Sequence, residues 1–181
     1  MYMVLDNSIE STHSKLSNES QYHMLDDKWT LWAHLPHDTD WTVKSYKKIM
    51  TFDSIESAIV LYETMPEKMI KNCMLFLMRD GIQPTWEDER NRNGGCFSYK
   101  VSNKVIVNAW KKASFAIIGE TITEEMKLSK QINGITISPK KNFCIVKIWL
   151  SSCVCKNPQK IHELPGITSQ GCLFKKHVPE Y

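Results

Sequence analysis

Residues 80–95 read DGIQPTWEDERNRNGG, and this stretch carries the most information in the chain. A glycine near one end and a glycine pair at the other predict a loop between two strands. Trp86 lies in its middle beside Glu87, Asp88 and Glu89. A tryptophan taken alone is most often packed under its own loop, and an acidic run is most often a solvated turn. A carboxylate site for a divalent metal is disfavoured, because no further carboxylates recur at a supporting spacing.

Short strands are predicted on both sides of this loop. They are runs of aromatic and apolar residues of strand length, bounded by Gly, Pro, Asp or Asn. These runs are residues 29–35, 46–52, 74–79, 96–101, 134–138 and 143–150. The last two flank Pro139 and three polar residues, which predicts a hairpin.

Two helices interrupt the strands. Ser54 can cap free amides at a helix start while Glu56 reaches back, and this helix should run to about Met65. A second helix is predicted over residues 104–118, because apolar residues repeat there at intervals of four and three and Gly119 supplies a stop. Strands, a helix and more strands with short connections favour an α+β fold, an antiparallel sheet with helices on one face. The polar residues 1–22 are expected to form a flexible arm before a single domain over residues 23–181.

Composition excludes several protein classes. The net charge of +3, from 23 basic against 20 acidic side chains, is too small for a protein that coats nucleic acid, so any such contact should be local. No apolar run reaches the length of a membrane span, and Asp6 and Glu10 stand where a signal peptide would be basic and apolar. We therefore expect a cytoplasmic protein with reduced cysteines. Cys153 and Cys155 are too close for the usual zinc spacing, so we expect no metal and no other cofactor.

Several stretches together resemble one family. They are KWTLW at 28–32, FDSIESAIVLY at 52–62, the loop at 80–95, IIGE at 117–120 and KIW at 147–149. The chain resembles the eukaryotic translation initiation factor 4E family, the messenger RNA cap-binding subunit of initiation factor 4F, over about residues 22–150. The resemblance implies a curved antiparallel sheet of about eight strands, with helices on the convex face and a cap slot on the concave face.

The resemblance also implies roles in binding the cap base. Trp86 matches one wall of a slot that stacks 7-methylguanine, and Trp41, in the loop after the first strand, is the candidate for the other. A positively charged base gains both stacking and cation attraction between two indoles. Glu87 would accept two charge-assisted hydrogen bonds from the base. Trp149 matches the residue that touches the added methyl group, although a core position remains open for it.

The family pattern breaks where the phosphates should bind. Lys140 occupies one basic position, with Lys141 beside it. Cys96 and Ile145 stand where the family usually has basic residues. The missing contacts could come from Lys141, Arg92, or Lys175 and Lys176, each of which could equally be a solvated surface charge. With so few basic residues, cap affinity is expected to depend only weakly on salt.

The family's partner-binding face departs as well. Ile59 stands where a tryptophan normally anchors the helical peptide of the scaffold subunit, and Lys111 stands where leucine is usual. His23, Ile55 and Phe115 remain compatible with a helix in a groove. We therefore expect a monomer that binds capped messenger RNA and either the scaffold subunit or a matched, divergent equivalent.

Two functions from different classes remain open. The first is a divergent cap-binding initiation factor, and the second is a cap-binding repressor that does not recruit the scaffold. An enzyme such as a cap hydrolase is disfavoured, because the acidic run lacks the spaced glutamates that metal-dependent pyrophosphate cleavage needs.

Overall fold

The computed structural model describes residues 22–177. The expected arm therefore lies outside the described residues, except for Tyr22. Seven strands form one antiparallel sheet in the order β2-β1-β3-β5-β6-β4-β7. Their bounds are β1 (Met24–His34), β2 (Lys47–Ser54), β3 (Met74–Arg79), β4 (Gly95–Ser102), β5 (Ile132–Pro139), β6 (Phe143–Leu150) and β7 (Leu173–Lys176). The predicted antiparallel α+β fold is confirmed, with seven strands among the described residues.

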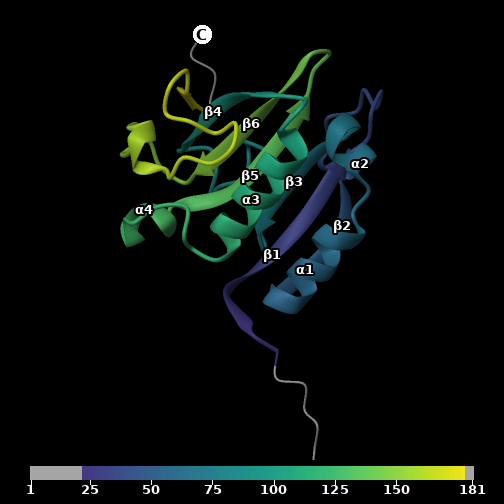
Figure 1. Ribbon diagram of the computed structural model, residues 1–181, viewed down its shortest axis with the longest axis horizontal. Helices are drawn as coiled ribbons and strands as arrows, with labels where there is room; N and C mark the ends of the chain where they lie inside the picture. Colours follow the sequence, from purple (N-terminus) through teal and green to yellow (C-terminus); the bar gives the residue numbers. More distant parts are fainter. Residues whose placement is uncertain (1–21, 178–181) are drawn as a thin grey trace, which may run out of the picture.

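Helices lie across one face of the curved sheet, as Figure 1 shows. The helices are α1 (Ile55–Thr64), α2 (Glu67–Asn72), α3 (Ile106–Ile118) and α4 (Met126–Ser129), with short 3-10 turns η1 (Val43–Ser45) and η2 (Pro158–Lys160). Helix α1 packs on β2, and α3 packs on β1, β4 and β5. In the described part of the chain, the opposite face of the sheet carries no α-helix.

The helix boundaries follow from local chemistry. The Ser54 side chain accepts a hydrogen bond from the Ser57 amide and caps α1, as predicted. Glu56 does not reach back to the cap. Its carboxylate accepts instead from the backbone amide of His23, at 3.1 Å. Helix α3 ends at Gly119, as the sequence predicts.

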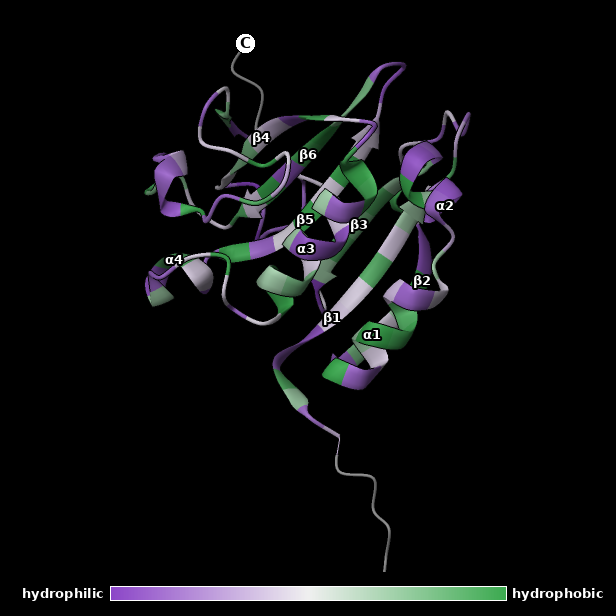
Figure 2. Ribbon diagram, in the orientation of Figure 1, coloured by the Kyte–Doolittle hydropathy of each residue, from purple (hydrophilic) through white to green (hydrophobic). Residues whose placement is uncertain are grey.

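The alternation of side chains along the strands gives the sheet two different faces. Trp29, Leu31 and Ala33 of β1 are fully buried in the main core beneath the helices. Trp32 has the opposite parity and packs on a smaller cluster on the helix-free face. That smaller cluster consists of Phe76, Met78, Ile82, Cys96 and Trp149, with Trp32, Tyr46 and Met74 packed against it. Trp29 and Trp110 are core residues as expected, whereas Trp32 is only partly buried. Apolar residues recur along the strands and helices in Figure 2.

Arg79, at the end of β3, ties several elements together. Its guanidinium pairs with Asp27 of β1 and with Glu120, 2.7 Å away, and it also donates to the Ile132 carbonyl of β5 at 2.7 Å. It lies over the Trp29 ring, 4.7 Å from the ring centroid. The Arg79 and Glu120 side chains are only 12% and 15% exposed. This network fixes the segment that follows α3 against the sheet.

Candidate functional site

Two exposed tryptophans face a pocket on the helix-free side of the sheet. Trp41 is 58% exposed and Trp86 is 41% exposed, which is unusual for side chains of this size. Both line a cavity of about 300 Å³, which we call the indole pocket. Its lining consists of Trp41, Tyr46, Met74, Phe76, Pro84, Thr85, Trp86, Glu87 and Trp149. The structure therefore brings together the four residues that the sequence selected for base binding.

The loop that carries Trp86 and Glu87 is held rigidly from beneath. The Asp88 carboxylate accepts hydrogen bonds from the amides of Gln83, at 2.8 Å, and Arg90, at 2.9 Å. Asn91 is fully buried, and its side-chain amide donates to the carbonyls of Gln83 and Thr85. Asp88 is thus not part of a solvated acidic turn. It organises the loop that presents its two neighbours.

Two further features anchor this loop to the sheet. Asn133 of β5 donates from its side chain to the Arg90 carbonyl, at 2.8 Å, and to the Asn91 side-chain oxygen, at 2.9 Å. A Cβ atom at Gly94 would lie 1.7 Å from the Leu150 carbonyl oxygen, so only glycine allows this approach to β6. Sequence reasoning did not identify Asn91 or Asn133, because their role depends on contacts between distant segments.

The pocket floor is apolar and aromatic. Trp149 is only 7% exposed, and its indole N–H donates to the Thr136 hydroxyl at 3.1 Å. The Tyr46 and Phe76 rings meet edge to face at 5.2 Å. Burial raises the pKa of the Tyr46 hydroxyl, and the negative charge of Glu87 raises it further. The charge of Glu87 thus reaches the Tyr46 hydroxyl. Among the residues that line the indole pocket, Glu87 is the single acidic one.

A second cavity of about 270 Å³ adjoins the first and shares Met74, Phe76 and Trp149 with it. Its charged lining residues are Lys140, Lys147 and Lys175, and its polar ones are Ser98, Thr136 and Ser138. We call this cavity the lysine groove. No carboxylate is among its lining residues in the described part of the chain. The groove is therefore suited to an anion that continues from the indole pocket.

The position of Lys147 and Lys175 follows from strand register. Cys96 of β4 lies opposite Trp149 of β6 on one side and opposite Lys175 of β7 on the other, so these three side chains share a face. Lys147 precedes Trp149 by two residues and shares that face too. Burial raises the pKa of the Cys96 thiol, while the charges of Lys147 and Lys175 act against that rise. Both ammonium groups therefore lie near Cys96, which stands where a basic side chain was expected.

The structure separates the other predicted phosphate residues from this groove. Lys141 and Arg92 are exposed and line neither cavity. Lys147 was not selected from the sequence, although its two-residue spacing from Trp149 could have indicated it. The expectation that affinity depends only weakly on salt rested on there being few basic residues at the site. Three lysines along one groove remove that reason.

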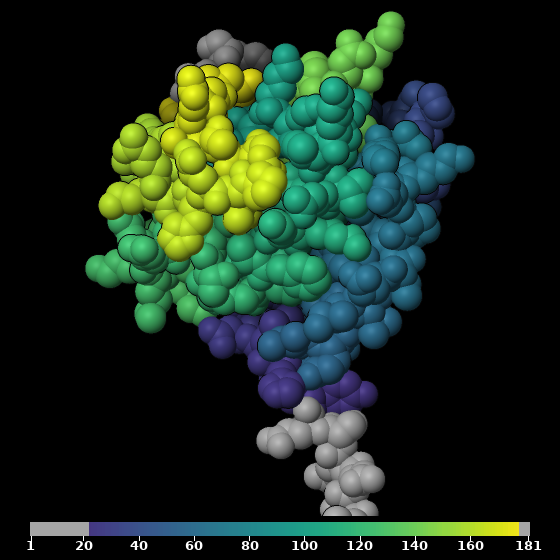
Figure 3. Space-filling view, viewed as in Figure 1, coloured from purple at the N-terminus to yellow at the C-terminus, as the bar shows by residue number. Residues whose placement is uncertain are grey.

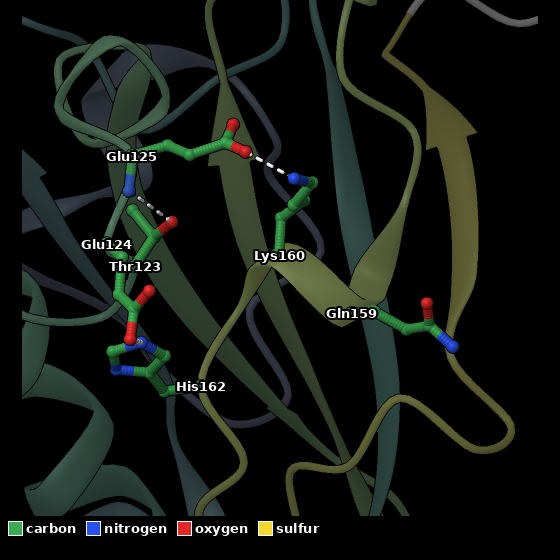
Figure 4. A pocket seen from close by; sticks show the side chains of 6 residues that line it. All are labelled: Thr123, Glu124, Glu125, Gln159, Lys160 and His162. Atoms are coloured by element: carbon green, nitrogen blue, oxygen red, sulfur yellow. Dashed lines mark hydrogen bonds and ion pairs between the residues drawn. The ribbon is translucent and has the colours of Figure 1, made fainter.

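A third hollow of about 290 Å³ lies between residues 123–125, which precede α4, and the segment of η2 and His162 (Figure 4). Its charged groups largely satisfy one another, because Lys160 pairs with Glu125 at 2.5 Å and His162 lies 3.9 Å from Glu124. The hydrogen bond with Glu125 raises the pKa of Lys160. This hollow has no aromatic lining, and its one lysine is already paired with Glu125.

The residues selected for partner binding gather on the helical face. Ile55 and Ile59 of α1 are 44% and 47% exposed. Lys111 of α3 lies 3.5 Å from Glu63 of α1, and the Phe115 ring lies 5.0 Å from Tyr62. The space-filling view in Figure 3 shows α1 and α3 on the same face. His23 joins them at the start of α1, where its carbonyl accepts from the Ile55 amide at 2.8 Å.

Comparison with known proteins gives a consistent result. Residues 12–176 match the family model described as eukaryotic initiation factor 4E. Eukaryotic translation initiation factor 4E of Candida albicans is 33% identical over 144 residues, 72% of this chain and 66% of the relative. A homolog from Acanthamoeba polyphaga mimivirus is 30% identical over 151 residues, 76% of this chain and 55% of the relative. The chain thus spans about two thirds or less of these relatives' length.

Solved structures of similar fold include two that were determined with cap compounds. Ascaris suum eIF4E-3 with m7G cap has a TM-score of 0.66 and 24% identity, covering 74% of this chain and 76% of that one. A Schistosome eIF4E complexed with m7GpppG and 4E-BP has a TM-score of 0.65 and 23% identity, covering 72% and 73%. At these identities the likeness establishes the fold. Among the described residues, no helix is long and apolar enough to cross a membrane, and no three His, Cys, Asp or Glu side chains group as metal ligands.

Proposed function

The chain belongs to the eukaryotic initiation factor 4E family, and from this premise we propose that it binds the 7-methylguanosine cap of messenger RNA as a non-enzymatic translation factor. The observation that carries the proposal is the pair of exposed tryptophans on one pocket that also holds Glu87. Solvent exposure of two indoles is costly, and a stacked ligand would cover both. Similar proteins bind cap compounds in the structures named above.

In this proposal the methylated base stacks between Trp41 and Trp86. Base–aromatic stacking contributes about 1–3 kcal/mol per base, and the positive charge of 7-methylguanine adds a cation–π attraction. Glu87 accepts hydrogen bonds from the base N–H groups. Trp149, on the pocket floor, bounds the space for the methyl group. Asp88 and Asn91 do not touch the base, but they hold the loop so that little ordering remains to be done on binding.

We assign the cap phosphates to the lysine groove. Lys140 is one phosphate ligand. Lys147 and Lys175 take the place of the basic residues that the family usually has at the positions of Cys96 and Ile145. Strand register supports this assignment, because it places Lys147 and Lys175 on the same face as Trp149. Lys141 and Arg92 have no direct part in it.

The helical face is assigned to a protein partner. The Schistosome structure contains a 4E-BP, and a Caenorhabditis elegans eIF4E-3 structure contains the 4E-binding protein Mextli. In this chain the exposed Ile59 offers a smaller anchor than tryptophan, and the pair of Lys111 with Glu63 places charge beside it. These features favour a partner with a matched, altered motif. They are also compatible with the alternative function, a cap-binding repressor that does not recruit the scaffold.

The cap proposal is tested by titrating 7-methyl-GTP and GTP while tryptophan fluorescence is measured. We expect 7-methyl-GTP to quench the fluorescence and to bind at least about tenfold more tightly, since the charge on the stacked base contributes about 1–2 kcal/mol. Trp86→Ala and Glu87→Gln should each abolish retention on cap resin and leave the thermal transition nearly unchanged. Equal affinity for GTP and 7-methyl-GTP would refute the proposal.

A further inference from the structure

Trp41 rests on a single buried histidine. The His34 and Trp41 rings are stacked with centroids 4.2 Å apart and an angle of 4° between their planes. His34 is the last residue of β1 and is only 3% exposed, whereas Trp41 is 58% exposed. An indole has two faces, and the parallel contact covers one of them. Most of the area that Trp41 exposes is therefore its other face and its edges.

The histidine is itself held in one orientation. Its Nε2 lies 2.8 Å from the carbonyl oxygen of Asp40, which can only accept, so Nε2 carries the hydrogen. The Tyr46 ring meets it edge to face at 5.3 Å. His34 does not line the indole pocket, while Trp41 and Tyr46 do. The imidazole thus stands behind the pocket wall and fixes the plane of Trp41.

Resting on the proposed cap binding, we propose that His34 is a positioning residue that orients Trp41, and that its protonation weakens cap affinity. In the neutral state the imidazole is a flat support for the indole. A proton on Nδ1 would make it a cation on the back of Trp41 while the methylated base places a second cation on the front.

Two cations on opposite faces of one indole oppose each other in two ways. Both draw on the same π-electron density, and they also repel directly across the ring. For charges about 8 Å apart in a medium of effective dielectric about 20 to 40, this repulsion corresponds to about tenfold in affinity. An imidazole is the side chain that changes charge between about pH 8 and 5.5.

The groups that face His34 come from its own loop and from the neighbouring strands. Asp40 belongs to the same loop as Trp41, and a hydrogen bond from the Thr42 amide lowers the pKa of its carboxyl, with smaller contributions from His34 and Lys47. Tyr46 directly precedes β2. From β3 the register partner is Met74, which carries no charge. Glu87 acts on Tyr46, whose ring in turn contacts His34.

The test compares the pH dependence of 7-methyl-GTP affinity in the full chain and in three variants. His34→Phe keeps a flat aromatic support without a titrating group, and His34→Ala removes the support. His37→Asn is the matched control, because His37 is an exposed histidine in the same loop whose left-handed backbone asparagine tolerates. Protonation of Glu87 and titration of the base affect all four proteins alike, so the difference between curves isolates His34.

We expect His34→Phe to bind like the unchanged protein at about pH 8 and to bind progressively more tightly than it as pH falls, by up to about tenfold. His34→Ala should bind weakly at every pH, and His37→Asn should follow the unchanged protein. Superimposable pH curves for the unchanged protein and His34→Phe would overturn the inference, as would tighter binding by His34→Ala, because the imidazole would then occupy the place of the base. Absence of 7-methyl-GTP binding by the unchanged protein at every pH would instead refute the proposed function.

Discussion

Lys147 and Lys175 should control how strongly cap affinity depends on the phosphates and on salt. The perturbation is Lys147→Gln and Lys175→Gln, singly and together, which keeps a flexible polar side chain and removes the charge. Both lysines line the lysine groove without a carboxylate among its lining residues, so their charges remain available to an anion.

The magnitude follows from the solvent exposure of these side chains, since Lys147 is half-buried and Lys175 is exposed. Screened contacts of this kind contribute about 0.5–1 kcal/mol each. Each single variant should therefore bind 7-methyl-GTP about two- to fivefold more weakly, and the double variant about tenfold more weakly. The slope of log affinity against log salt should become less steep by about 0.7–0.9 for each lysine removed.

Fluorescence titration at several salt concentrations measures both quantities. Lys68→Gln on α2 is a matched control, because Lys68 is an exposed lysine on the helical side. 7-Methylguanosine, which has no phosphate, should bind the double variant and the unchanged protein equally. If the double variant kept the full salt slope, or lost as much affinity for 7-methylguanosine as for 7-methyl-GTP, the assignment of the phosphates to this groove would be wrong.

Three further predictions concern other parts of the molecule. Arg79→Met leaves the mostly buried Glu120 without its cationic partner, which should cost about 3 kcal/mol and lower Tm by about 10 °C in a calorimetric scan. Burial lowers the pKa of His177 from 6.5 to about 4, so between these pH values the folded state binds fewer protons than the unfolded state. The stability that depends on a neutral His177 is therefore complete above pH 6.5 and is lost as pH falls towards 4. Urea unfolding should show this loss in the unchanged protein and a smaller one in His177→Phe. Ile59→Trp combined with Lys111→Leu should strengthen binding of a helical scaffold peptide at least about thirtyfold in calorimetry, and an unchanged affinity would show that flanking contacts already compensate.

The sequence alone was sufficient for the elements whose patterns are local. Strands β3 and β6 coincide with the predicted residues 74–79 and 143–150, because an apolar and aromatic run of strand length bounded by turn residues can be recognised within the strand itself. Helix α3 was predicted to within two residues, since its buried stripe and the following glycine both lie in the local sequence. Helices α2 and α4 and strand β7 were not predicted. Each has six residues or fewer, too short to establish a period, and β7 is specified by its pairing with the edge of β4.

For the site, the sequence selected Trp41, Trp86, Glu87 and Lys140, because rare residue types in loops and a family resemblance mark them without reference to distant contacts. Only the tertiary structure decided what supports them. Lys147 and Lys175 belong to strands whose shared face is set by pairing through β4, and His34 lies behind Trp41 because the loop folds back on the end of β1. Such roles depend on register and on loop closure. Both are determined by the packing of the whole sheet, and apart from the two-residue spacing of Lys147 and Trp149 no local pattern in the chain marks these roles.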